Sequence, residues 1–264
     1  MAKNPNGTPR MGKINNEIVS KAIAPKASRC GNTTKIDYGT PPDRLDPDGH
    51  FYSIMLSPEQ IKLRDAIWNP DVKIVFCDAP AGTGKSVVSV GTAIMMYRYG
   101  LCQGVTYVVA PYAEASMGFL PGDITSKVRA YLEPLTQAVL EANESPMHSI
   151  IQECPDDRKD MAYINAIAHS YLRGHTFSEQ VVILEESQNF TEADLRKTLT
   201  RAKDDCKIIV IGHSKQIDLK NANSSGFVRC MKHFARKNDP RVVVCNLTHN
   251  YRGFVSRIAD ESWD

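Results

Sequence analysis

One short segment combines glycines, a lysine and a hydroxyl group at a spacing that suits the binding of phosphate. Residues 79–86 read APAGTGKS and lie between a short apolar run and a long amphipathic stretch. Gly82 and Gly84 allow backbone amides to turn toward an anion, and a helix that begins at Lys85 adds the positive end of its dipole. Lys85 would reach the β- and γ-phosphates, and the Ser86 hydroxyl would be a ligand of Mg²⁺. The segment predicts a P-loop that binds ATP and Mg²⁺.

The P-loop motif also predicts which residues contact the nucleotide. It departs from the usual pattern at Ala79, which stands in place of the first glycine. Alanine fits there if its φ is negative, because the position only leads out of the preceding strand. A chance glycine turn before a helix is disfavoured, because the motif and its context agree. The expected contacts are Ala81, Gly82, Thr83, Gly84, Lys85, Ser86 and Val87.

Two adjacent carboxylates follow a second apolar run. Residues 181–184 read VVIL, which is typical of a buried strand, and Glu185 and Glu186 come next. The carboxyl ends of parallel strands meet at the ligand-binding edge, so both carboxylates should lie beside the P-loop. We assign Glu185 to the Mg²⁺ shell, Glu186 to polarising the attacking water, and Gln188 to sensing the γ-phosphate. The open alternative is a charged strand end that caps the next helix.

These groups need a scaffold of strands followed by helices. Short β-branched runs predict buried strands, and their alternation with amphipathic stretches predicts an α/β fold with a parallel sheet flanked by helices. The segment 143–160, polar with two prolines, predicts a mobile insertion. The expected strands are 73–77, 106–110, 181–184, 207–211 and 242–245, with a weaker one at 164–168; the expected helices are 85–99, 123–142, 192–202, 226–237 and 253–261.

The N-terminal region differs in composition from the rest of the chain. Residues 1–35 hold seven lysines or arginines and a single acidic residue, Glu17. We expect residues 1–51 to form a flexible basic arm, with a short helix at 14–23, and residues 52–264 to form one domain. That domain should begin with a helix capped by Ser57, with Gln60 at the capping-box position.

Composition excludes several classes of protein. The 264 residues are 42% hydrophobic and 23% charged, with a net charge of +2, as in an ordinary globular protein. Seven scattered cysteines without a CxxC pair argue against a disulfide framework or a cysteine zinc site, and fit a reducing cytoplasm. No apolar run approaches the roughly 20 residues of a membrane span, and we expect no membrane partner.

Several strings occur in the order found in one known family. Besides the P-loop they are GFLPGD at 118–123, LRG at 172–174, ESQN at 186–189, LTR at 199–201 and QIDL at 216–219. The chain resembles PhoH-like proteins over roughly residues 56 to 258. The resemblance implies a cytoplasmic ATPase with a RecA-like fold, similar to the first motor domain of superfamily-one helicases. It also implies a link to phosphate starvation and to RNA.

The resemblance assigns further roles at matching positions. Gln60 is similar to the glutamine that recognises adenine, and Glu186 to the catalytic acid. Arg252 and Arg257 resemble the C-terminal arginine motif. The chain departs from the family at three positions, where Glu185 and His213 stand in place of aspartates and Ala110 in place of an arginine. These departures put the rate of hydrolysis in doubt more than binding; a lone histidine such as His213 is more often structural than catalytic.

One motor domain alone would lack a partner domain to supply a cation to the transferring phosphate. We therefore expect a homo-oligomer, with a hexamer favoured by the resemblance, in which a neighbour supplies an arginine. Arg252 is the first choice, Arg257 the second and Arg201 the third. The alternative is that each arginine forms a surface ion pair.

The leading functional hypothesis is an ATPase coupled to RNA or single-stranded DNA, with helicase-like activity. The basic arm could bind phosphate backbones, although a solvated tail is the simpler interpretation. A second hypothesis is an ATP-binding switch or scaffold with little hydrolysis. A third is a nucleic-acid packaging motor, and a small-molecule kinase is less favoured because no substrate lid is visible.

Overall fold

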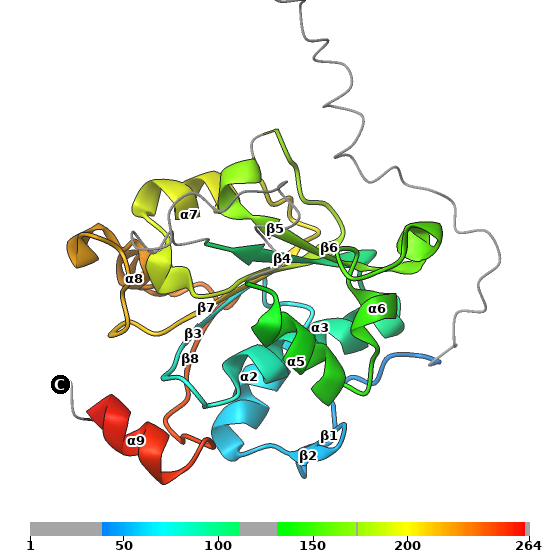
Figure 1. The fold of residues 1–264 in the computed structure, drawn as a ribbon, viewed down its shortest axis with the longest axis horizontal. Helices are drawn as coiled ribbons and strands as arrows, with labels where there is room; N and C mark the ends of the chain where they lie inside the picture. The colour runs from blue at the N-terminus through cyan, green and yellow to red at the C-terminus, as the bar shows by residue number, and fades with distance from the viewer. Residues whose placement is uncertain (1–38, 111–130, 173, 262–264) are drawn as a thin grey trace, which may run out of the picture. The chain divides into compact units, whose positions relative to one another are not determined.

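Six strands carry the fold, and every neighbouring pair among them is parallel (Figure 1). The computed structural model describes residues 39–110, 131–172 and 174–261. The strand order is β5-β4-β6-β7-β3-β8, so all carboxyl ends lie at one edge of the sheet. The strands are β3 (Ile74–Asp78), β4 (Gly104–Val109), β5 (Ile164–Ala168), β6 (Gln180–Leu184), β7 (Lys207–Gly212) and β8 (Val242–Asn246).

Apolar side chains cover both faces of this sheet. In β3 the alternate residues Val75 and Cys77 join one core cluster, and Ile74 and Phe76 join the other. Each buried valine or isoleucine stabilises the fold by roughly 1.5–3 kcal/mol, which explains the β-branched runs. The predicted α/β architecture with a mainly parallel sheet is confirmed.

The helices divide between the two faces, as Figure 1 shows. Leu63 of α2, Val88 of α3 and Leu135 of α5 pack in the first cluster, and Leu195 of α7 and Phe227 of α8 pack in the second. The helices are α2 (Pro58–Trp68), α3 (Lys85–Arg98), α5 (Glu133–Glu141), α6 (Pro146–Ser149), α7 (Glu192–Leu199), α8 (Phe227–Ala235) and α9 (Phe254–Glu261).

The first helix of the sheet domain begins as the sequence predicts. The Ser57 side chain accepts from the Gln60 backbone, and the Gln60 side chain accepts from the Ser57 backbone, which completes the capping box of α2. The predicted helix 192–202 is shorter, because the chain after Leu199 turns to bond with Phe177. The predicted helices 14–23 and the first part of 123–142 lie outside the described residues.

Residues 143–160 are more tightly held than the mobile insertion that we predicted. They contain α6 and a 3₁₀ turn, Asp156–Met161, and the Ile150 side chain is fully buried. The Gln152 amide pairs with both the N–H and the carbonyl of Ala166, at 3.1 and 2.7 Å. At Ala166 this side chain takes the place that a neighbouring strand would have at the edge of β5.

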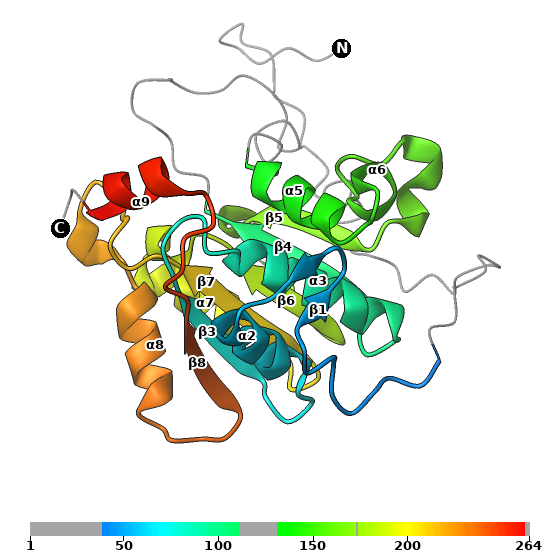
Figure 2. The ribbon, with the colours of Figure 1, turned by 90° about the horizontal axis from the view of Figure 1, so that it is seen from below.

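Packing also begins before the expected boundary at residue 52. A small hairpin, β1 (His50–Phe51) and β2 (Ile54–Met55), buries the Phe51 side chain, which is 1% exposed. The Trp68 indole donates to the carbonyl of Pro42 at 2.9 Å. Figure 2 shows β1 beside α2 and α3. Among the described helices, none is both long and apolar enough to cross a membrane.

Candidate functional site

The predicted P-loop lies at the carboxyl edge of the sheet, between β3 and α3. Gly82 and Gly84 have positive φ values of 76° and 80°, a conformation that glycine adopts without strain. Gly84 is also the N-cap of α3 and supplies no side-chain cap, so the first amides of the helix are left to bind an anion. Ala79 does not have a positive φ, and its N–H donates to Gly212 at 3.0 Å. Alanine is therefore compatible with the first position of the motif.

The Lys85 side chain is suited to an anionic ligand. It is only 7% exposed, and none of the described residues provides a hydrogen bond or an ion pair to its ammonium group. The nearby Glu185 carboxylate attracts this charge, and a bound phosphate would give the ammonium group a direct hydrogen-bonding partner. The loop thus fits the β- and γ-phosphates of a nucleotide.

Gln60 is held against the P-loop by both ends of its carboxamide. Its oxygen accepts from Ser57 at 2.9 Å, and its Nε2 donates to the Thr83 carbonyl at 2.9 Å. A Cβ at Gly84 would lie 2.6 Å from that nitrogen, so the glycine also permits this close approach. Gln60 therefore holds the loop in place, and its predicted contact with adenine stays a prediction.

Glu185 lies between two elements at the end of β6. Its Oε1 accepts from the Ser86 hydroxyl at 3.0 Å, and its Oε2 accepts from the Tyr107 hydroxyl at 2.9 Å. The residue is 3% exposed, and burial, followed by the nearby Glu186, raises its pKa to about 7. Ser86 and Glu185, the predicted Mg²⁺ ligands, are thus brought together; Tyr107 was missed, because nothing local in the sequence marks it.

Glu186 and Gln188 form a second polar group beside the first. Glu186 has a left-handed backbone with φ 49°, and its carboxylate accepts from the Gln188 amide. The Gln188 oxygen accepts from the His213 N–H at 2.9 Å, and the residue is 1% exposed. Gln188 thus joins the predicted catalytic acid to the loop after β7. Its predicted contact with the γ-phosphate stays a prediction.

Arg252 lies beside the P-loop of its own chain. The Tyr251 N–H donates to the Gly82 carbonyl at 2.8 Å, and a Cβ at Gly82 would lie 2.8 Å from Cγ of Arg252. The Arg252 N–H is in turn fixed by the Asn250 side chain at 2.8 Å. Arg252 therefore lies beside the loop of its own chain, and its predicted action on a neighbouring protomer stays a prediction.

The other two predicted arginines lie elsewhere. Arg257 is exposed on α9. Arg201 donates to the His175 carbonyl at 3.0 Å, and its backbone bonds to Phe177 before β6 begins. Because β6 and β7 are parallel, this contact lies toward their amino ends, away from the P-loop edge. Arg201 therefore could not serve the site of its own chain.

The loop, the acid pair and the C-terminal arginine all lie within one matched region. The family model for PhoH-like protein matches residues 54–259. The chain belongs to the PhoH-like protein family. It is 36% identical over 155 residues to a PhoH-like protein of Synechocystis and 35% identical over 156 residues to one of Bacillus subtilis. Each match covers 58% of this chain but 45% and 46% of those relatives, so it spans about half of their length.

A solved structure also matches part of this chain. The large terminase of a thermophilic bacteriophage matches with a TM-score of 0.49 and 13% identity, over 78% of this chain and 49% of that one. The RecA-like class predicted from the resemblance is consistent with the observed sheet and with the family.

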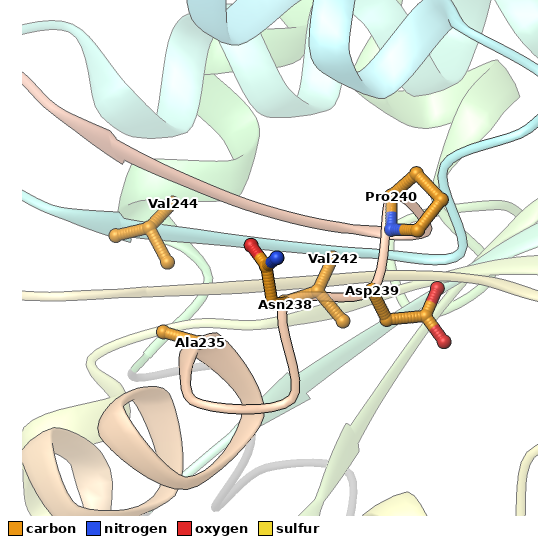
Figure 3. Close-up of a pocket in the computed structure, with 6 residues that line it drawn as sticks. All are labelled: Ala235, Asn238, Asp239, Pro240, Val242 and Val244. Carbon is orange, nitrogen blue, oxygen red and sulfur yellow. The ribbon is translucent and has the colours of Figure 1, made fainter.

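None of the predicted site residues lines the pocket of about 360 Å³ that Figure 3 shows. It is formed between the end of α8 and the beginning of β8, the strand at one edge of the sheet. Its amino-end position separates it from the P-loop, and both polar and apolar groups form its wall. It is lined by Ala235, Asn238, Asp239, Pro240, Val242 and Val244.

The raised pKa of Glu185 predicts a pH-dependent stability. The folded protein holds this proton up to about pH 7, whereas the ordinary value is 4.5. Stability that depends on Glu185 is therefore fully present below pH 4.5 and is lost as the pH rises toward 7, by roughly 3 kcal/mol. Urea unfolding at pH 5 and pH 8 should show the wild type losing stability relative to Glu185→Gln. Parallel pH profiles for the two proteins would contradict the prediction.

Proposed function

We propose that residues 52–264 act as a single ATPase domain that binds ATP with Mg²⁺ and hydrolyses it. The observation that carries the proposal is the convergence of Lys85, Glu185, Glu186 and Arg252 on the two ends of one loop. Lys85 and the uncapped start of α3 suit the binding of phosphates. The Glu185 and Glu186 carboxylates suit a metal ion and a water molecule.

Ser86 and Glu185 are the residues that would hold Mg²⁺. Their side-chain oxygens are already 3.0 Å apart, and hard oxygen donors are the ligands that Mg²⁺ prefers. When bound, the ion offsets the negative charge on the β- and γ-phosphate oxygens. Ser86 and Glu185 would then give up the hydrogen bond between them, and each would gain a contact with the ion in its place.

Glu186 is the residue that would accept a proton from the attacking water. The Gln188 amide holds its carboxylate from one side. Lys85 would neutralise charge on the phosphates, and Arg252, whose side-chain Cγ lies beside Gly82, would bring a second cation to the same loop. Charge that develops on the transferring phosphoryl group would then face two cations, which lowers the barrier.

Replacing Arg252 with alanine should slow hydrolysis by about 100-fold and spare ATP binding. The cation is needed most as charge develops in the transition state, whereas the loop amides and Lys85 bind the ground state. Steady-state phosphate release and binding of an ATP analogue measure the two effects. Arg236→Ala, an exposed arginine beyond α8, is the matched control. An equal loss of binding and turnover would argue against this role.

The location of Arg252 also bears on assembly. We propose a homo-oligomer, with a hexamer favoured, but Arg252 would act within its own chain. Mixing Lys85→Ala chains with Arg252→Ala chains tests this point. Activity that stays low in the mixture supports action within one chain. Recovered activity would show that one protomer supplies the arginine to its partner, as we first expected.

The coupling of this ATPase to RNA or single-stranded DNA, in a cytoplasmic setting with a role in phosphate starvation, is part of the same proposal. It rests on the family and on the basic composition of residues 1–35. A switch or scaffold with little hydrolysis is the second candidate. The observation in its favour is Glu185, which is buried and has a pKa near neutrality, so that the metal must compete with a proton.

ATP turnover with and without single-stranded RNA or DNA, with the assembly state measured alongside, tests the proposal. Strong stimulation by nucleic acid is the expected result. Turnover that ignores nucleic acid would leave a stand-alone ATPase. Binding of ATP without turnover would favour the switch and overturn the proposed hydrolysis.

A further inference from the structure

The Tyr107 hydroxyl is buried at the metal end of the site. Tyr107 lies on β4, next to β6, where it pairs with Ile183, and its side chain is fully buried. Burying a hydroxyl group destabilises the folded protein unless the hydroxyl has a hydrogen-bond partner. Its acceptor is Oε2 of Glu185, at 2.9 Å. The contact crosses from one strand to the next and links two residues far apart in sequence.

Glu185 uses its whole carboxylate to connect two elements. One oxygen accepts from Tyr107 of β4 and the other from Ser86 of α3. The backbone does not move freely here, because the Glu185 N–H donates to Val108 at 2.9 Å. An aspartate would be shorter by one methylene, about 1.5 Å, and could not reach both hydroxyls from the same backbone position.

We propose that Tyr107 is a positioning residue that fixes the Glu185 carboxylate so that its other oxygen faces the Mg²⁺ site at Ser86. Tyr107 and Glu185 depend on each other. The Tyr107 hydroxyl needs a side chain as long as glutamate to accept its hydrogen bond, and the Glu185 carboxylate needs that hydroxyl to hold its orientation. This inference rests on the proposed binding of Mg²⁺ and nucleotide. It gives a physical reason for glutamate at a position where the family resemblance leads one to expect aspartate.

Tyr107 would act by holding the Glu185 carboxylate in one orientation. Phenylalanine at position 107 keeps the ring and its packing but leaves Oε2 of Glu185 without its donor. The carboxylate is then free to turn away from Ser86, and the oxygen intended for the metal is no longer held in place. Groups that orient metal ligands in this way typically change metal affinity by about 10- to 100-fold when they are removed.

A double-mutant cycle tests the unit. The proteins are the wild type, Tyr107→Phe, Glu185→Asp and the double variant, and the readout is the Mg²⁺ concentration that half-saturates binding of a slowly hydrolysed ATP analogue. We expect each single change to raise that concentration about tenfold and the double variant to match the singles. Tyr163→Phe is the matched control, because Tyr163 packs against Tyr97 away from the P-loop.

The outcomes separate the inference from the proposed function. Thermal unfolding shows whether the variants fold. If Tyr107→Phe does not fold, Glu185→Asp, which retains Tyr107, tests the same contact. Unchanged Mg²⁺ dependence in a folded variant, or two independent effects that multiply in the double variant, would overturn the inference. Phosphate release by the wild type is measured separately. Its absence would refute hydrolysis, while the Mg²⁺ dependence of binding would still decide the role of Tyr107.

Discussion

Changing Glu186 to glutamine is expected to reduce ATP turnover by about 1,000-fold and to leave ATP affinity nearly unchanged. The substitution keeps the size of the side chain but removes the group that accepts a proton from water. The Gln188 amide donates to the carboxylate in the wild type and can donate equally to the new amide oxygen. The local fold should therefore survive, and the loss should fall on the chemical step.

Phosphate release under single-turnover conditions measures this effect most cleanly. Glu192→Gln is the matched control, because Glu192 pairs with Arg229 on the surface and lies outside the site. Wild-type turnover by Glu186→Gln would show that another group activates the water. Loss of ATP binding in a folded variant would instead place Glu186 among the binding residues.

Lys85→Ala should differ from Glu186→Gln, because it should lose ATP binding as well as turnover. Lys85 is the first residue of α3 and is 7% exposed, and its ammonium group makes no hydrogen bond or ion pair with the described residues. We expect ATP affinity to fall by about 100-fold, with turnover too slow to detect. A fluorescent ATP analogue measures the affinity.

The same substitution should leave the fold intact. The Lys85 charge attracts Glu185 but makes no hydrogen bond or ion pair with the described residues, so thermal stability should change only slightly. Lys62→Ala, on the exposed surface of α2, is the matched control and should bind ATP normally. Retained affinity in Lys85→Ala would mean that the loop amides bind the phosphates without it.

Local signals in the sequence were sufficient for much of the fold. The β-branched runs located the strands to within two residues, because strands buried on both faces must be apolar throughout. The capping box at Ser57 and Gln60 located the start of α2, and the glycines located the P-loop. Each of these features depends on residues that are close together in the chain.

Contacts between distant residues were not predictable in this way. The brace from Gln60 to Thr83, the bond from Tyr107 to Glu185 and the approach of Arg252 to Gly82 each join separate elements. They depend on the strand order of the sheet, which composition and periodicity do not specify. Gln152 is a similar case. Its hydrogen bonds to β5 help to order residues 143–160, a segment whose composition is polar and irregular.

The central claim is that the amides of the P-loop, together with Lys85, bind the β- and γ-phosphates of a nucleotide. Calorimetric titration of the wild type with ATP, ADP and AMP in Mg²⁺ tests it most directly. The account predicts one site per chain, with ATP and ADP bound and AMP at least about 100-fold weaker, because AMP lacks both phosphates. Equal affinity for AMP, or no saturable binding of ATP, would contradict it.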